Sequence, residues 1–127
     1  MVCDSNRVGN GGCDTLATLL RDPNCNLHTL YLAGNVIDNE GAIALTNSLA
    51  NNTKLKVLNL ARNSIGDDGS EALAALLEDT GCNLQRLDLT NNRINNEGAT
   101  TLANSLSNNT KMKELYLGVT PNGCTRA

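Results

Sequence analysis

The amino-acid sequence predicts an α/β solenoid, in which units of one short strand and one helix stack along a single axis. Three features predict this fold class: an internal repeat, a leucine and asparagine pattern common to the repeats, and apolar spacing that changes from strand to helix within each unit. The chain has 127 residues, of which 40% are hydrophobic and 2% aromatic, with neither Trp nor Phe. We therefore expect a single domain, residues 1–127, whose core is built from leucine and alanine.

The repeat is evident from direct alignment of the chain with itself. Residues 27–54 align with residues 84–111 without a gap and are identical at 17 of 28 positions. The segment between them, 55–83, has the same pattern and is longer by a single residue, and residues 6–26 are in register with residues 63–83. Shorter and longer units therefore alternate, and every second unit is equivalent. We place a partial repeat at 1–26, full repeats at 27–54, 55–83 and 84–111, and a partial repeat at 112–127.

Each full unit begins with the pattern L-x-x-L-x-L-x-x-N, which predicts a short strand followed by a turn. In the first full unit Leu30 and Leu32 alternate and point inward, and Asn35 is placed to bond the backbone of the following turn and of the neighbouring unit. Stacked asparagines predict a ladder along the solenoid. The equivalent residues are Leu58, Leu60 and Asn63, then Leu87, Leu89 and Asn92, and last Met112, Leu115 and Leu117, where Thr120 replaces the asparagine and Pro121 interrupts the pattern.

A helix is predicted in the second half of every unit. Acidic and amide runs such as residues 38–40 offer caps for a helix start, and they lack the spacing of a calcium loop. Ala42, Leu45 and Leu49 then recur at helical spacing and predict an apolar stripe facing the strands. A further helix is expected at about 13–22. The glycines of one repeat position are interpreted as backbone positions that allow close approach to the strand layer: Gly12, Gly41, Gly69 and Gly98.

The recurring pattern resembles the ribonuclease-inhibitor-like subfamily of leucine-rich repeat proteins, which also includes receptor repeat domains and Ran GTPase-activating proteins. The resemblance covers about residues 6–118. It implies a right-handed solenoid, here a short horseshoe arc, with a parallel β-sheet on the concave face and α-helices on the convex face. The function it favours is a non-catalytic protein–protein interaction module. GTPase regulation and nuclease inhibition are less favoured, because both are associated with a longer arc.

Composition excludes several other functions. The net charge of −3 and the scarcity of aromatic residues disfavour nucleic-acid binding. The sequence contains neither a membrane-spanning run nor a signal peptide, so we expect a cytoplasmic protein. Five cysteines without a C-x-x-C pair predict free thiols, with no metal and no cofactor. We expect Cys3, Cys25 and Cys82 to be buried or half-buried, and Cys13 and Cys124 to be exposed.

The sequence offers no catalytic arrangement. His28 is the only histidine, and it shares a solvated row at the edge of the strands with Lys56, Gln85 and Lys113. No nucleophile is placed to meet it, so we do not expect an enzyme. The Asn-Asn-Thr segments at 51–53 and 108–110 match the glycosylation acceptor, but we interpret them as polar turns that end the shorter units.

The outward positions of the strands are the candidate binding surface. Their residues differ from unit to unit, while the inward leucines do not. Tyr31 and Tyr116, the only aromatic residues, both lie on this face beside arginines, and both residue types are enriched at interface hot spots. Asn59, near the centre, is expected to tolerate alanine with little loss of stability. The predicted protein-binding residues are Thr29, Tyr31, Val57, Asn59, Arg62, Arg86, Asp88, Glu114 and Tyr116.

The two ends of the chain suggest an alternative function. By the register that aligns every second unit, residue 1 falls within a strand and residue 127 falls before a helix, so each end is half a unit. A shortened chain with frayed ends explains this most simply. In the alternative, the ends of two copies stack and form a homo-oligomer through Val2, Cys3, Met112, Leu115 and Leu117.

Overall fold

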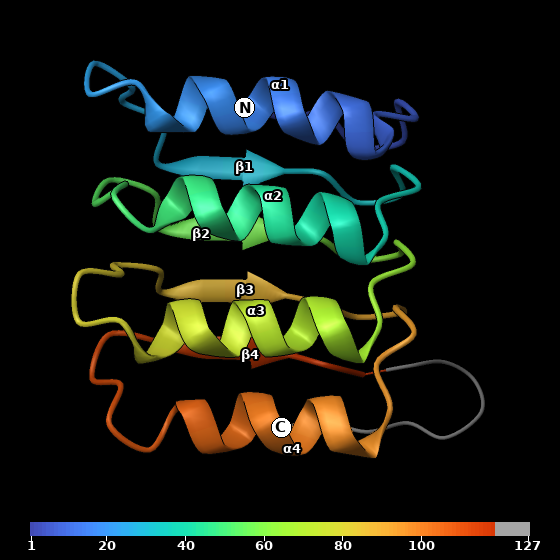
Figure 1. Ribbon diagram of the computed structural model, residues 1–127, viewed down its shortest axis with the longest axis vertical. Helices are drawn as coiled ribbons and strands as arrows, with labels where there is room; N and C mark the ends of the chain where they lie inside the picture. The colour runs from blue at the N-terminus through green and yellow to red at the C-terminus, as the bar shows by residue number, and fades with distance from the viewer. Residues whose placement is uncertain (119–127) are drawn as a thin grey trace.

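The computed structural model describes residues 1–118 of the chain, and the expectations for Thr120, Pro121 and Cys124 lie outside this range. Helices and strands alternate, and successive units stack along the long axis of the molecule (Figure 1). The predicted α/β solenoid is thus confirmed. In chain order the elements are α1 (Gly9–Arg21), β1 (Thr29–Tyr31), α2 (Asn39–Leu49), β2 (Val57–Asn59), α3 (Asp67–Glu78), β3 (Arg86–Asp88), α4 (Asn96–Ser105) and β4 (Glu114–Tyr116).

The strands form one parallel sheet in the order β1-β2-β3-β4. The alternating repeat lengths keep equivalent residues in register, so one row across the sheet consists of Leu30, Leu58, Leu87 and Leu115. All four side chains are buried, because the inward position of each strand packs against the helix layer. The segment before α1 extends the sheet through a single parallel bridge between Val2 and Tyr31.

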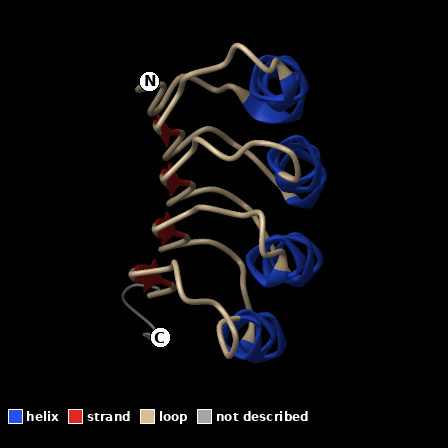
Figure 2. Cartoon of the chain, turned by 90° about the vertical axis from the view of Figure 1, so that its left-hand side faces the viewer, coloured by secondary structure: helices blue, strands red, loops and turns tan. Residues whose placement is uncertain are grey.

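Strands and helices form two layers joined by loops. Seen from the side, the strands line one edge and the helices the other, and the helices are spread further apart than the strands (Figure 2). A strand spacing of about 4.8 Å is narrower than the spacing of about 8–10 Å between packed helices, so the stack bends with the sheet inside. The strand layer is therefore the concave face. The interior between the layers is apolar and includes Leu32, Leu60, Ile65, Leu73, Leu89 and Leu102.

A ladder of asparagines ties each unit to the preceding one. The Oδ1 atom of buried Asn63 accepts hydrogen bonds from the backbone N–H groups of Asn35 and Ile37, at 2.9 and 3.0 Å. Asn35 and Asn92 bond the preceding unit in the same way. The bonds to the neighbouring unit are as predicted, but within its own unit Asn63 bonds the end of the strand and not the following turn. The carbonyl acceptors of its Nδ2 atom are those of Leu32, Leu60 and Ala61.

A second ladder, not predicted from the sequence, runs along the helix starts. The Oδ1 atom of Asn39 accepts hydrogen bonds from the backbone N–H groups of Gly66 and Gly69, at 2.7 and 2.9 Å, at the start of the next helix. The cap of α3 therefore comes from the preceding unit, since its own N-cap residue is glycine. Asp38 also caps its own helix, as predicted, by accepting from the N–H of Glu40. The equivalent bonds between units join Asp38 N–H to Asn10 and Asn95 N–H to Asp67.

The shared glycine position lies at this second ladder. A Cβ atom at Gly69 would be 2.6 Å from Cγ2 of Ile65 and 2.9 Å from Oδ1 of Asn39, distances that no side chain tolerates without movement. A Cβ atom at Gly98 would meet the equivalent pair of neighbours. The predicted close approach is confirmed, but the neighbours are the capping side chain and the isoleucine before the helix, and not the strand layer.

The first helix begins earlier than expected. The prediction of about 13–22 placed its start inside the glycine run, whereas α1 extends over Gly9–Arg21. The repeat register explains the difference, because the alignment of 6–26 with 63–83 maps the start of α3 onto Asn10. Packing against α2 therefore sets this boundary more strongly than the low helix propensity of glycine does.

The cysteines correct one prediction. Cys13, expected to be exposed, is fully buried (0%) on the inner face of α1, together with Ala17 and Leu20 at helical spacing. Burial raises the pKa of the Cys13 thiol to about 11, and nearby carboxylates contribute to the shift. Cys25 and Cys82 are buried and Cys3 is half-buried, as predicted, and all four thiols are free.

Candidate protein-binding surface

The outward positions of the strands lie in rows across the concave face. The strand register gives the predicted rows: Thr29, Val57, Arg86 and Glu114 in the first, and Tyr31, Asn59, Asp88 and Tyr116 in the second. All eight side chains are half-buried or exposed, whereas the leucines between them are buried. Small residues form the third row, in which Ala33 and Ala61 are buried.

A connected cluster occupies the C-terminal half of this face. The guanidinium of Arg86 lies over the ring of Tyr116, with 5.3 Å between Cζ and the ring centroid. The Tyr116 hydroxyl donates a hydrogen bond to Oε2 of Glu114. This bond, with help from the charge of Asp88, raises the pKa of Tyr116, and Arg86 acts in the opposite direction. Arg86 reaches diagonally to Tyr116 although the register places Glu114 directly beside it.

Asn59 and Asp88 do more than present polar groups to solvent. The Oδ1 atom of Asn59 accepts a hydrogen bond from the N–H of Ala61, and that of Asp88 accepts one from the N–H of Thr90, each at 2.9 Å. Both bonds fix the turn that follows the strand. The expectation that Asn59 tolerates alanine without loss is therefore corrected, because that substitution removes a backbone partner.

The N-terminal half of the same face is apolar. Val2 is 69% exposed and forms the parallel bridge with Tyr31, so both side chains lie on the concave side of the sheet. Thr29 and Val57, in the neighbouring row, are half-buried. Val2 was predicted only as an end residue. The signal that locates it here is the repeat register, which gives it the same strand position as Asn59.

Arg62 occupies a turn position beside the sheet. It is exposed and has φ +54°, in the left-handed region, and the same repeat position has φ +58° at Ser5, +68° at Gly34 and +59° at Asn91. Gly34 adopts this conformation without strain, whereas Arg62 does not. Arg62 is held there by its backbone N–H, which donates to the carbonyl of Thr90 in the next unit at 2.8 Å.

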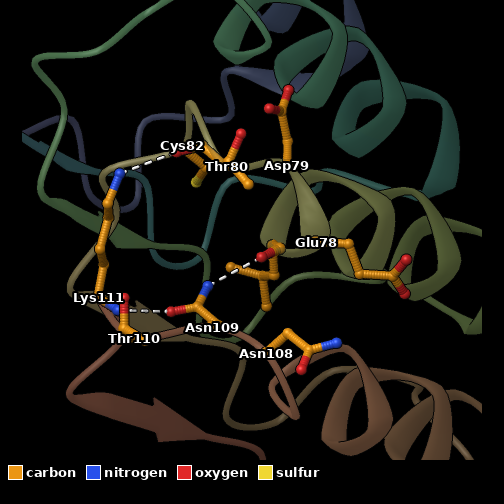
Figure 3. Close-up of a pocket in the computed structure, with 9 residues that line it drawn as sticks. Glu78, Asp79, Thr80, Cys82, Asn108, Asn109, Thr110 and Lys111 are labelled. Carbon is orange, nitrogen blue, oxygen red and sulfur yellow. Dashed lines mark hydrogen bonds between the residues drawn. The ribbon is translucent and has the colours of Figure 1, made fainter.

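Two equivalent pockets open on the edge where helices lead into strands. One has a volume of about 90 Å³, and its labelled residues come from the end of α3 and from the loops on either side (Figure 3). Asn109 donates to the carbonyl of Leu77 at 2.8 Å, and Lys111 Nζ donates to that of Thr80 at 2.9 Å. The other pocket lies at the equivalent place two units earlier in the chain and has a volume of about 300 Å³. These polar groups hold the loops together, so we assign the pockets a structural role.

The described residues offer no catalytic or metal-binding arrangement. His28 is exposed in the predicted row at the strand edge. Residues 1–118 contain no cluster of His, Cys, Asp and Glu side chains suited to a metal ion. None of the helices in that range is both long and apolar enough to cross a bilayer. The two Asn-Asn-Thr segments lie at turns, where Asn52 and Asn109 bond the backbone of the loop.

Comparison with known families decides the class of protein. The family described as Leucine Rich repeat matches residues 24–45, 51–74 and 82–103, which together make up just over half of the chain. The chain is a leucine-rich repeat protein. The three matches fall on the three full repeats that the sequence predicts, and they cover the strands β1, β2 and β3 that carry most of the candidate surface.

Relatives of this leucine-rich repeat protein are large proteins with several domains. NACHT, LRR and PYD domains-containing protein 3 of Bos taurus is 33% identical over 113 residues, which are 89% of this chain and 11% of the relative. Protein 14 of the same series, from Homo sapiens, is 38% identical over 85 residues, or 67% of this chain and 8% of the relative. The chain therefore spans about a tenth of the length of these relatives.

A solved structure shows the same fold. Leiomodin-1 Actin-Binding Site 2 matches with a TM-score of 0.74 and 22% sequence identity, over 90% of this chain and 65% of that one. At this identity the likeness establishes the architecture of the repeat protein and not its partner.

The residues predicted to mediate end-to-end stacking differ in exposure. Val2 is exposed, and Cys3 and Met112 are half-buried. Leu115 and Leu117, at 8% and 4% exposed, are buried in the core of the repeat protein. The inward position of a strand explains this, because it turns the leucines toward the helix layer and not toward the end of the stack.

Proposed function

We propose that this leucine-rich repeat protein is a non-catalytic interaction module that binds another protein on the concave face of its sheet. The observation that carries the proposal is the contrast within each strand. The inward residues are repeated leucines, while the outward residues are exposed, differ between units and include the cluster of Arg86, Glu114 and Tyr116. A fixed scaffold with an exchangeable surface is what a binding module requires.

The Arg86 cluster suits protein recognition for a physical reason. Tyr and Arg dominate interface hot spots, because each buries a large planar surface and also offers polar groups. Contact with the Tyr116 ring and the hydrogen bond to Glu114 restrict these side chains before any partner arrives. Restriction in advance lowers the entropy lost on binding. The solved structure with this fold is named for binding actin, itself a protein, which supports a protein as the class of partner.

Site-specific photo-cross-linking tests the proposal. A photoreactive phenylalanine replaces Thr29 or Val57 on the concave face, and Asn47 or Ala75, both exposed on the helices, serves as the matched control. The chain is exposed to a cell extract and the cross-linked proteins are identified by mass spectrometry. We expect the same protein from both concave sites and not from the helix sites. Capture of one protein from the helix sites alone would contradict the proposal.

The finer predictions from the sequence keep the status of proposals. The ribonuclease-inhibitor-like subfamily rests on the alternation of 28- and 29-residue units, and a reducing, cytoplasmic location agrees with the free thiols of Cys3, Cys13, Cys25 and Cys82. Assembly of copies end to end is tested by light scattering after size exclusion over a hundredfold concentration range. A mass that rises with concentration supports stacking, and a constant mass equal to that of the 13.4 kDa monomer excludes it.

A further inference from the structure

Charge is distributed unevenly over the concave face. In the first two rows the N-terminal half consists of Val2, Thr29, Tyr31 and Val57, none of which is charged. The C-terminal half contains Arg86, Asp88 and Glu114, with two carboxylates for one guanidinium. A partner that covers the whole face must therefore present an apolar end and a charged end.

The single guanidinium does not neutralise the two carboxylates. Arg86 faces the ring of Tyr116, so its charge is directed at a π-surface. Asp88 uses Oδ1 for the N–H of Thr90, and Glu114 accepts the hydroxyl of Tyr116. These bonds hold both carboxylates in place while leaving them without an ion pair among the described residues. The raised pKa of Tyr116 reports the same excess of negative charge, since Glu114 and Asp88 act against Arg86.

The two halves lie at a distance that one short segment can span. Tyr31 and Asp88 occupy the same row on β1 and β3, two strand spacings apart, which corresponds to about 10 Å. Two turns of an α-helix rise about 11 Å, and three residues of an extended chain rise about 10 Å. A single polypeptide segment can therefore contact both halves at once.

We infer that the concave face recognises a basic polypeptide segment, one that packs an apolar side chain against Val2, Tyr31 and Val57 and places a Lys or Arg side chain beside Asp88 and Glu114. The inference rests on the proposed function and adds the chemistry of the partner. Charge complementarity selects basic over acidic segments, because an acidic segment would meet two fixed carboxylates at short range. The apolar half supplies contact area and is indifferent to the sign of the charge.

Selection from a displayed library of random peptides of about 12 residues tests the inference on the full chain. The recovered peptides are sequenced, and one is synthesised with a fluorophore for affinity measurement by anisotropy. The expected sequences combine Lys or Arg with an apolar residue. The D88N/E114Q double variant should bind at least about tenfold more weakly, and this difference should shrink at high salt. The control, E71Q/E78Q, changes the net charge equally on exposed positions of α3 and should alter affinity less than about twofold.

The variants keep the fold and separate the two hypotheses. Asn59 already holds an asparagine at the position of Asp88 and makes the same backbone bond, so D88N retains the turn. Acidic or neutral peptides whose binding weakens in Tyr31→Ser would overturn the inference and leave concave binding intact. Peptides that respond to neither Tyr31→Ser nor D88N/E114Q would overturn both. Failure to recover any peptide would also count against the inference.

Discussion

The inward and outward positions of the same strands obey different rules. Leu58 and Leu87 point inward and are identical and fully buried, while Val57 and Arg86, one residue earlier in each strand, differ in size, charge and exposure. Each inward residue contacts the units on both sides, so a change in one unit disturbs its neighbours. An outward residue has solvent on one side. The comparison teaches that repetition in this chain records packing and that variation marks the surface available for recognition.

The largest effect is expected where the inside is polar. Asn63→Ala leaves the backbone N–H groups of Asn35 and Ile37 buried without acceptors, and each such loss costs about 1–3 kcal/mol. We expect the free energy of unfolding in urea to fall by about 4 kcal/mol. Asn47→Ala on an exposed helix surface is the control and should change it by less than about 0.5 kcal/mol. Similar values for the two variants would mean that the ladder does not hold the units together.

Truncation of an inward leucine should follow closely. Leu60→Ala removes a fully buried side chain at the centre of the stack and should cost about 2–5 kcal/mol in the same denaturation experiment. Leu60→Met keeps the volume and should cost less than about 1.5 kcal/mol. A loss in Leu60→Ala that is no larger than in Leu60→Met would contradict the assignment of this position to the core.

Stability should also depend on pH through an inward thiol. The folded chain keeps Cys13 neutral with a pKa of about 11, against an ordinary value of 9.0, so the unfolded chain loses its proton first as the pH rises. The stabilisation is complete below about pH 9 and is lost as the pH approaches 11, on the order of 2–3 kcal/mol in total. Unfolding measured between pH 8 and about 10.5 should show this decline. Cys13→Ala should flatten it, and an equally steep decline in that variant would refute the role of Cys13.

A polar outward residue should matter less. Asn59→Ala removes one hydrogen bond to the N–H of Ala61, at a half-exposed site where water can replace it, so we expect a cost of about 0.5–1.5 kcal/mol. Asn59→Asp keeps the acceptor, as Asp88 does in the next unit, and should recover most of the loss. Thermal unfolding of the three proteins distinguishes this bond from a general effect of the position, which would affect both variants equally.

The smallest effect on stability belongs to the binding cluster. Arg86 is exposed and its described ring contact is with Tyr116, so Arg86→Ala should lower the free energy of unfolding by less than about 1 kcal/mol. Arg86→Lys keeps the charge and loses the planar stacking. A loss above about 2 kcal/mol in Arg86→Ala would show that the cluster serves the fold and not recognition.

The sequence predicts the repeat, the strand register and the outward rows because each follows from spacing alone. The alternating repeat lengths place Thr29 beside Val57 and Tyr31 beside Asn59 without any knowledge of loop geometry. Burial of Cys13 escaped prediction because the glycine run hid the start of α1, and the ladder through Asn39 escaped because its bonds cross between units. The contact of Arg86 with Tyr116 depends on a diagonal choice of rotamer, and no spacing specifies a rotamer.

The central claim is that the outward strand positions bind a protein while the inward positions only maintain the fold. The most direct test is the affinity for the cross-linked protein of two double variants, Tyr31→Ala with Arg86→Ala on the concave face and Asn47→Ala with Glu71→Ala on the helices, each with its free energy of unfolding. We predict a loss of affinity of at least about thirtyfold for the concave variant and less than about twofold for the helix variant, with similar unfolding energies. Equal losses, or a loss confined to the helix variant, would contradict the claim.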